Sequence, residues 1–170
     1  MREDLQRTRS ALARAIAQDP RELPDLPGDP ANPYALFQQR HLAPQRQMDQ
    51  LVTPLRDHVR QSVARASTAL RRLAALDAAL EQTLAAREQA LMPTAAGLLQ
   101  RRFEQLRQAH RQALDAAGAP DDPARWRAPG GWLAAFEPQW REALLAEVDL
   151  RLEPVKGLVE ALDNASKQQA

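Results

Sequence analysis

The 170-residue sequence contains no cysteine. This absence excludes disulfides, thiolate metal sites, cysteine nucleophiles and cysteine redox chemistry. Phenylalanine, tryptophan and tyrosine together make up only 4% of the chain, and the β-branched residues that strands prefer are also scarce. Alanine and leucine supply most of the apolar content, and both favour helix. The composition therefore predicts an all-α protein.

Long apolar runs are also missing. No stretch approaches the roughly 18 uncharged apolar residues that cross a bilayer, so no membrane insertion is expected. The first ten residues, MREDLQRTRS, carry mixed charges in place of the basic patch and apolar run of a secretion signal. A cytoplasmic location is the simplest prediction. The length is that of one ordinary domain, so we expect residues 1–170 to form a single helical domain.

Apolar residues recur at helical spacing in four segments of the chain. Helices are predicted over residues 1–18, 34–66, 69–117 and 132–165, with a loop at 118–131. Residues 19–33 contain five prolines, which cannot sustain a helix because each ring removes a backbone donor and clashes with the preceding turn. This segment is predicted to be an extended linker. Prolines also fall inside the predicted helices and should kink or break them; they are Pro44, Pro54, Pro93, Pro138 and Pro154.

The longest helical segment, residues 69–117, carries leucines at a spacing close to alternating threes and fours. At 1.5 Å per residue it would form a rod of roughly 70 Å. One short helix cannot cover a stripe of that length. We therefore expect an elongated bundle of antiparallel helices with coiled-coil-like packing, which self-associates as a homodimer or homo-oligomer through this helix. The leucines expected in the seam are Leu73, Leu80, Leu84, Leu91 and Leu98.

All three tryptophans lie within fifteen residues of one another. Trp132, Phe136 and Trp140 recur every four residues, so they line one face of the last helix. Two interpretations remain open. The residues form a hydrophobic plug at the end of the bundle, or they form a docking surface for a partner, since tryptophan is enriched at interface hot spots. Trp126, between two arginines, is the tryptophan expected to be most exposed.

Charge is unevenly distributed although the net charge is only +1. Residues 40–111 hold twelve arginines and six acidic residues, whereas residues 112–170 hold six basic and ten acidic residues. These parts could attract each other within one chain or between two copies. Arginines along a rod could instead follow a phosphate backbone, which is the basis of non-specific nucleic-acid binding. The candidates for nucleic-acid contact are Arg56, Arg60, Arg65, Arg71, Arg72, Arg101, Arg102, Arg107 and Arg111.

The residue types that carry catalysis do not form a recognisable site. His41, His58 and His110 are far apart in the sequence, and none has the spacing of metal ligands. Ser62 lies one helical turn beyond His58, but no acid, oxyanion donor or glycine-rich elbow accompanies the pair. We expect no catalytic residue, metal or cofactor, and therefore no enzyme.

Four segments resemble an uncharacterised bacterial family of domain-of-unknown-function proteins: PYALFQQRHLAPQRQM, LRRLAALDAALEQTLAARE, LLQRRFEQLRQAH and LLAEVDLRLEPVKGLVEAL. Together they cover most of residues 33–163. The resemblance implies no activity, cofactor or catalytic residue. It suggests additional N-terminal sequence in other members, and an association with envelope or stator-like components, which would make the protein an accessory part of a multi-component machine.

Two functions are compatible with these observations. The first is a non-catalytic helical scaffold or adaptor that self-associates and docks to protein partners. The alternative is a nucleic-acid-binding accessory protein that uses its arginine-rich helix faces.

Overall fold

The computed structural model describes residues 1–18 and 34–168, and all their side chains except those of residues 84–96 and 168. The predicted all-α class is confirmed, because the described residues form helices and no strand. The linker predicted at residues 19–33 lies outside the described residues. The elements are α1 (Arg2–Gln18), α2 (Ala35–Ala66), α3 (Thr68–Ala117), the short 3₁₀ helix η1 (Pro123–Arg125) and α4 (Trp132–Gln168).

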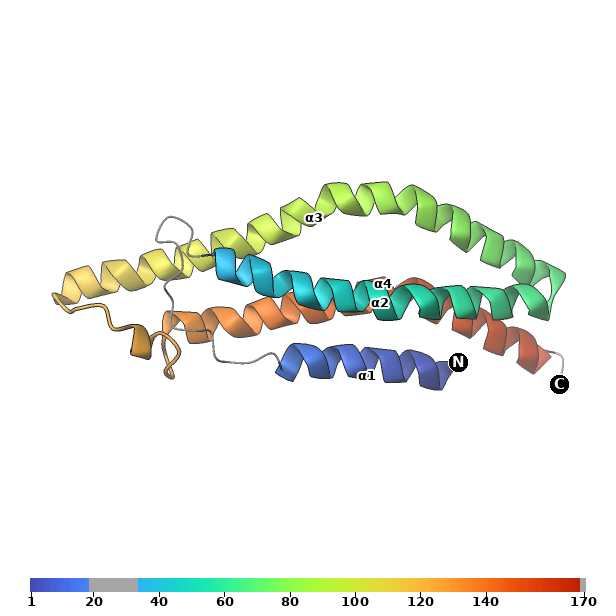
Figure 1. The fold of residues 1–170 in the computed structure, drawn as a ribbon, viewed down its shortest axis with the longest axis horizontal. Helices are drawn as coiled ribbons and strands as arrows, with labels where there is room; N and C mark the ends of the chain where they lie inside the picture. Colours follow the sequence, from blue (N-terminus) through green and yellow to red (C-terminus); the bar gives the residue numbers. More distant parts are fainter. Residues whose placement is uncertain (19–33, 169–170) are drawn as a thin grey trace.

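The four α-helices form an elongated bundle (Figure 1). Helices α2, α3 and α4 run in alternating directions, and α1 lies along α2 and α4. Helix α3 is longer than its neighbours and extends beyond the start of α2. It is also bowed, so that its middle runs away from α2 in the view of Figure 1.

Helix α3 begins and ends at residues suited to those positions. Ser67 is extended, and its hydroxyl accepts a hydrogen bond of 3.1 Å from the backbone N–H of Leu70, so it caps the helix start. Gly118 has a left-handed backbone with φ of 59°, and the N–H of Ala119 donates to the carbonyl of Leu114. Glycine adopts this conformation without steric cost. The single extended residue Ser67 folds α3 back onto α2 as an antiparallel neighbour.

Helices α2 and α4 continue through their internal prolines, Pro44 and Pro54 in the first, Pro138 and Pro154 in the second. The expectation that these four prolines break the helices is therefore wrong. That they kink the helices stays a prediction. Pro93 lies outside the described side chains. An internal proline costs about 3 kcal/mol. Several buried apolar side chains on the same helix, each contributing about 1.5–3 kcal/mol, outweigh that cost.

The core contains two parts. At the end where α2 and α4 begin, five aromatic rings pack with centroids 4.9–6.3 Å apart, one pair stacked and the others edge to face or tilted. They are Tyr34, Phe37, Phe103, Phe136 and Trp140. Towards the other end, smaller residues of α2 and α4 fill the centre of the bundle. They are Met48, Val59, Val63, Val148 and Val155.

The loop before α4 requires a glycine at position 131. A Cβ atom there would lie 2.2 Å from the carbonyl oxygen of Trp126 and 2.4 Å from that of Arg125. The chain is held this close because the N–H of Leu133 donates to the Trp126 carbonyl at 3.0 Å. Gly157, in α4, has no atom within 4 Å of the corresponding position.

We expect Gly131→Ala to destabilise the protein by about 1–3 kcal/mol, because backbone atoms must move to admit the methyl group. The matched variant Gly157→Ala should stabilise it by about 0.5–1 kcal/mol, because alanine is the better helix former. Urea denaturation followed by circular dichroism measures both. Equal effects of the two substitutions would contradict the close approach at Gly131.

Candidate interaction surfaces

The aromatic residues predicted on one face of the last helix are part of the core. Trp132, Phe136 and Trp140 are buried, so the docking interpretation is wrong for these three. Their side chains meet the rings of α2 and α3, and this contact holds the three helices together. Trp126, expected to be exposed, is half-buried, and its ring lies 5.5 Å from that of Trp132.

A polar contact fixes Trp126 at the end of the bundle. Its Nε1 donates to an Asp121 carboxyl oxygen at 2.7 Å, and Nε2 of His110 lies 2.9 Å from the same oxygen. Burial acts to raise the pKa of Asp121, but the hydrogen bonds from Trp126 and His110 outweigh it and leave this pKa below its ordinary value. The histidine therefore anchors a loop at this end of the bundle.

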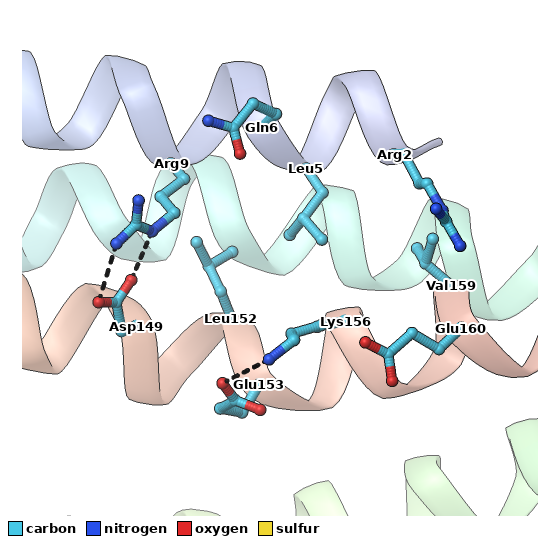
Figure 2. A pocket seen from close by; sticks show the side chains of 10 residues that line it. All are labelled: Arg2, Leu5, Gln6, Arg9, Asp149, Leu152, Glu153, Lys156, Val159 and Glu160. Carbon is cyan, nitrogen blue, oxygen red and sulfur yellow. Dashed lines mark hydrogen bonds and ion pairs between the residues drawn. The ribbon is translucent and has the colours of Figure 1, made fainter.

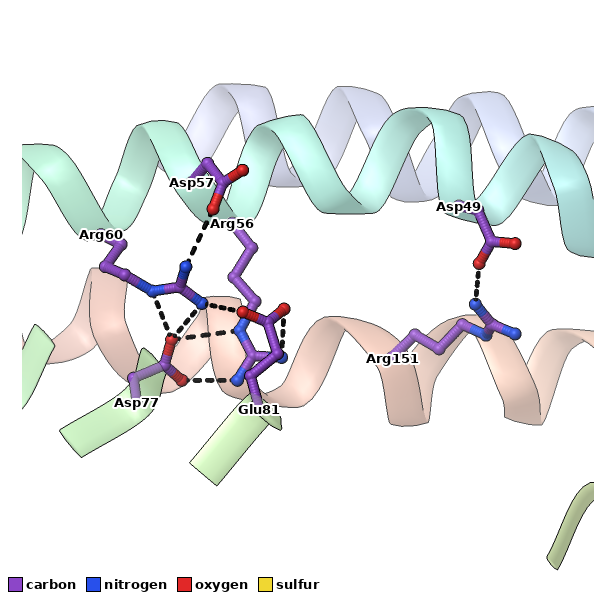
Figure 3. A network of polar contacts seen from close by, with 7 residues as sticks. All are labelled: Asp49, Arg56, Asp57, Arg60, Asp77, Glu81 and Arg151. Carbon is purple, nitrogen blue, oxygen red and sulfur yellow. Dashed lines mark hydrogen bonds and ion pairs between the residues drawn. The ribbon is translucent and has the colours of Figure 1, made fainter. Parts of the chain in front are cut away.

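Two of the arginines predicted to contact nucleic acid are already paired within the chain. Arg56 donates from Nη2 and Nε to the two carboxyl oxygens of Asp77, at 2.7 and 3.1 Å. Arg60 donates to Asp77 at 2.9 Å, to Glu81 at 2.5 Å and to Asp57 at 2.8 Å (Figure 3). Both arginine side chains are mostly buried. This pairing leaves little of either guanidinium group open to a phosphate backbone, and their contact with nucleic acid stays a prediction.

The sequence contains a signal for this ion-pair network, which was not among the predictions. Arg56 and Arg60 are one turn apart before Ser67, and Asp77 and Glu81 are one turn apart after it. An antiparallel hairpin brings positions at similar distances from the turn side by side. Residues of opposite charge that are spaced by one turn on each helix, at similar distances from the break, therefore indicate an ion pair between the two helices.

The other predicted arginines lie at the surface in two groups, one at the turn between α2 and α3 and one in the second half of α3. Arg102 donates to the side chain of Gln139 in α4 at 2.9 Å, and Arg71 to the carbonyl of Ala64 at 3.4 Å. Burial, followed by the charge of Arg111, lowers the pKa of half-buried Arg107. Of these arginines, Arg65, Arg72, Arg101 and Arg111 are exposed and have no hydrogen bond or ion pair to any described residue.

The structure separates the leucines predicted in the oligomer seam. Leu73 packs against the core of its own chain, so the seam does not extend to it. Leu80 and Leu98 are 48% and 57% exposed, while Leu84 and Leu91 lie outside the described side chains. Leu76, one turn before Leu80, is also exposed and was not predicted in the seam.

Leu80 and Leu98 lie on the side of α3 that faces α4. At 100° per residue, both are within about 40° of Arg102 around the helix, and Arg102 reaches Gln139 of α4. Leu150 follows Gln139 by eleven residues, within about 20° of it, and therefore faces α3. Yet Leu150 is 70% exposed, the largest exposure among the large apolar residues described.

Helix α2 contributes one more residue of this kind. Leu42 precedes Arg60 by eighteen residues, five full turns, so it lies on the same side of α2 as Arg60, which reaches α3. It is 49% exposed. Leu42, Leu80, Leu98 and Leu150 thus lie on helix sides turned towards neighbouring helices but remain open to solvent. We refer to these four as the uncovered leucines.

A groove of about 580 Å³ runs between α1 and α4 (Figure 2). Its apolar side chains are Leu5, Leu152 and Val159. Arg9 is paired with Asp149 at 2.6 and 3.1 Å, and Lys156 with Glu153 at 3.4 Å. The Arg9–Asp149 pair joins α1 to α4, whereas the Lys156–Glu153 contact lies within α4.

His41 and Ser62 also have partners within the chain. Nε2 of His41 lies 3.6 Å from the carboxylate of Glu147, which also accepts from Arg151 at 2.8 Å. The hydroxyl of Ser62 donates to the backbone carbonyl of His58 at 3.0 Å and not to its ring. Within the described part of the chain, no group of three His, Asp or Glu residues is placed to hold a metal ion.

Residues 1–164 match the family model described as "Protein of unknown function (DUF3348)". The chain therefore belongs to this family, which confirms the resemblance found in the sequence. No curated protein and no solved structure matches the chain. Within the ranges that the structure describes, none of the helices is long and apolar enough to cross a membrane.

The ion-pair network makes stability depend on pH. Burial acts to raise the pKa of Asp77, but hydrogen bonds from Arg56 and Arg60 outweigh it, so its pKa in the folded state is below the ordinary value. A lowered folded pKa means that this stabilisation is complete above the unfolded pKa of about 3.9 and is lost as pH falls through the folded value.

We expect Asp77→Asn to lower the free energy of unfolding at neutral pH, because two mostly buried guanidinium groups lose their shared carboxylate. The variant should also lose less further stability than the native protein between about pH 5 and pH 3. Urea denaturation across this range measures both effects. The control is Asp57→Asn, at an exposed carboxylate that pairs with Arg60 alone. A pH dependence equal in Asp77→Asn and the native chain would contradict the role of Asp77.

Proposed function

We propose that this DUF3348 member is a non-catalytic, cytoplasmic helical scaffold that self-associates as a dimer and docks to protein partners. The uncovered leucines support the proposal. They come from α2, α3 and α4, they lie on helix sides turned towards other helices, and they remain about half exposed or more. Large apolar groups that a monomer leaves open mark a surface for association.

The size of the effect is consistent with a reversible dimer. Covering the exposed part of four leucines contributes roughly 3–7 kcal/mol for each copy, because burial of a fully exposed leucine contributes about 1.5–3 kcal/mol and these are about half exposed or more. Association costs about 4–15 kcal/mol in lost rigid-body freedom. The leucines alone therefore support weak binding, and other contacts across the interface must add to it.

A second copy of the chain is the occupant that the charges favour. The exposed charges without an ion pair to any described residue include Arg72 and Arg101 on α3, and Glu142 and Glu160 on α4. A second copy supplies both charges and the same leucines. In a two-fold dimer each contact is made twice, which doubles the contribution of a modest surface. Docking of other proteins onto such a dimer would make it an accessory component of a multi-protein bacterial machine.

Nucleic-acid binding is the second candidate. Four exposed arginines without ion pairs favour it: Arg65, Arg72, Arg101 and Arg111. It is the weaker candidate because Arg56 and Arg60, at the centre of the predicted basic row, are paired with Asp77. Binding of this kind would weaken steeply with salt.

The dimer is tested by sedimentation equilibrium at micromolar concentrations. We expect the native chain to dimerise, and the double variant Leu80→Gln/Leu98→Gln to be a monomer with unchanged helix content, since both side chains are exposed in the monomer. The control is Leu145→Gln, at an exposed leucine that lies about 240° around α4 from Gln139 and so away from α3. It should remain a dimer.

Two results would overturn the proposal. One is a native chain that stays monomeric at all concentrations. The other is a double variant that dimerises as strongly as the native chain. If the double variant loses helix content, the single variant Leu98→Ser separates the two effects, because it removes one exposed side chain and leaves α3 otherwise intact.

A further inference from the structure

We infer that an acidic face of α4 is the surface on which α3 of the second copy docks. The face consists of Glu142, Glu153 and Glu160, with Leu150 at its edge. This inference rests on the proposed self-association. It adds that α4 of one copy contacts α3 of the other.

The three carboxylates form one line along α4. Glu153 and Glu160 follow Glu142 by eleven and eighteen residues, which places all three within about 20° around the helix. The buried residues of α4, such as Leu144 and Val155, lie on the opposite side. The line therefore faces away from the core of its own chain.

The acidic face is what remains of α4 after its other carboxylates are paired. Asp149 and Asp163 accept from arginines of α1, and Glu147 accepts from Arg151. In contrast, Glu142 and Glu160 are exposed and have no ion pair to any described residue. Glu153 has only a contact of 3.4 Å to Lys156, with both side chains more than half exposed. These charges are available to a partner.

Helix α3 carries the complementary surface. Arg72, Leu76 and Leu80 follow one another at one-turn steps, so they lie on one side of α3, and all three are exposed. Arg72 has no ion pair to any described residue. One flank of α3 thus presents a cation followed by two leucines, and the acidic side of α4 presents anions beside a leucine.

The two surfaces match in register. Arg72 and Leu80 are eight residues apart, as are Glu142 and Leu150. A parallel arrangement that places Leu80 of one copy beside Leu150 of the other also places Arg72 beside Glu142. Within one chain α3 and α4 are antiparallel (Figure 1). A two-fold axis perpendicular to the bundle reverses the second copy, so its α3 runs parallel to the first copy's α4.

In the proposed contact, Arg72 of one copy lies beside a carboxylate of α4 of the other copy, which is an attractive pair. Exposed ion pairs each contribute about 0.2–1 kcal/mol, so they select the docking surface, while the leucines provide most of the binding free energy.

Charge reversal with complementation tests the inference. We expect Glu142→Lys and Arg72→Glu each to raise the dimer dissociation constant about tenfold, because both copies of the contact become repulsive. An equimolar mixture of the two variants should restore dimerisation as a heterodimer, since one contact is then native and the other reversed. Native mass spectrometry identifies the heterodimer by mass, and sedimentation equilibrium gives its affinity.

The matched control is Glu104→Lys, the same change at an exposed acid about 240° around α3 from Leu98; it should dimerise like the native chain. The inference is overturned if Glu142→Lys dimerises normally, or if the mixture forms no heterodimer. Failure of the proposed function gives a different result, which is a native chain that never dimerises. If only Leu80→Gln/Leu98→Gln loses the dimer, self-association stands and docking on the acidic face of α4 is rejected.

Discussion

The attachment of α3 at its two ends governs the rest of the structure. At the start of the helix, the carboxylate of Asp77 is shared by Arg56 and Arg60 of α2, which fixes α3 just after the Ser67 turn. Towards its other end, Phe103 packs among the rings of α2 and α4. Between these attachments α3 is bowed (Figure 1). The uncovered leucines of α2, α3 and α4 form the surface that the proposed dimer would cover.

Much of the fold could be predicted because the signals are local. Helical periodicity, the extended Ser67 and the left-handed Gly118 correspond to the ends of α3 in the structure. The path through the internal prolines could not be predicted, because it depends on burial of residues from other helices. Leucine spacing also placed Leu73 and Leu80 in one seam, whereas the structure buries part of Leu73 and exposes Leu80. Periodicity alone does not tell which side of a long helix its own chain covers.

The candidate surfaces were predicted less well, and the reason is the pairing of charges over long sequence distances. Arg56 and Arg60 look like free cations in the sequence and become internal partners of α3 only when the hairpin forms. Conversely, Glu142 and Glu160 look like ordinary surface acids, and their availability emerges once α1 has paired with Asp149 and Asp163. The charges that remain after folding, and not those counted in the sequence, are the ones that can recognise a partner.

The claim that a second copy covers the uncovered leucines is tested most directly by thiol protection, since the native chain has no cysteine. A single cysteine is introduced as Leu80→Cys, and its rate of reaction with a maleimide is measured from dilute to concentrated protein. The account predicts that this thiol becomes protected as concentration rises, while the thiol of Leu145→Cys stays equally reactive. A Leu80→Cys thiol that reacts at the same rate at every concentration would contradict the account.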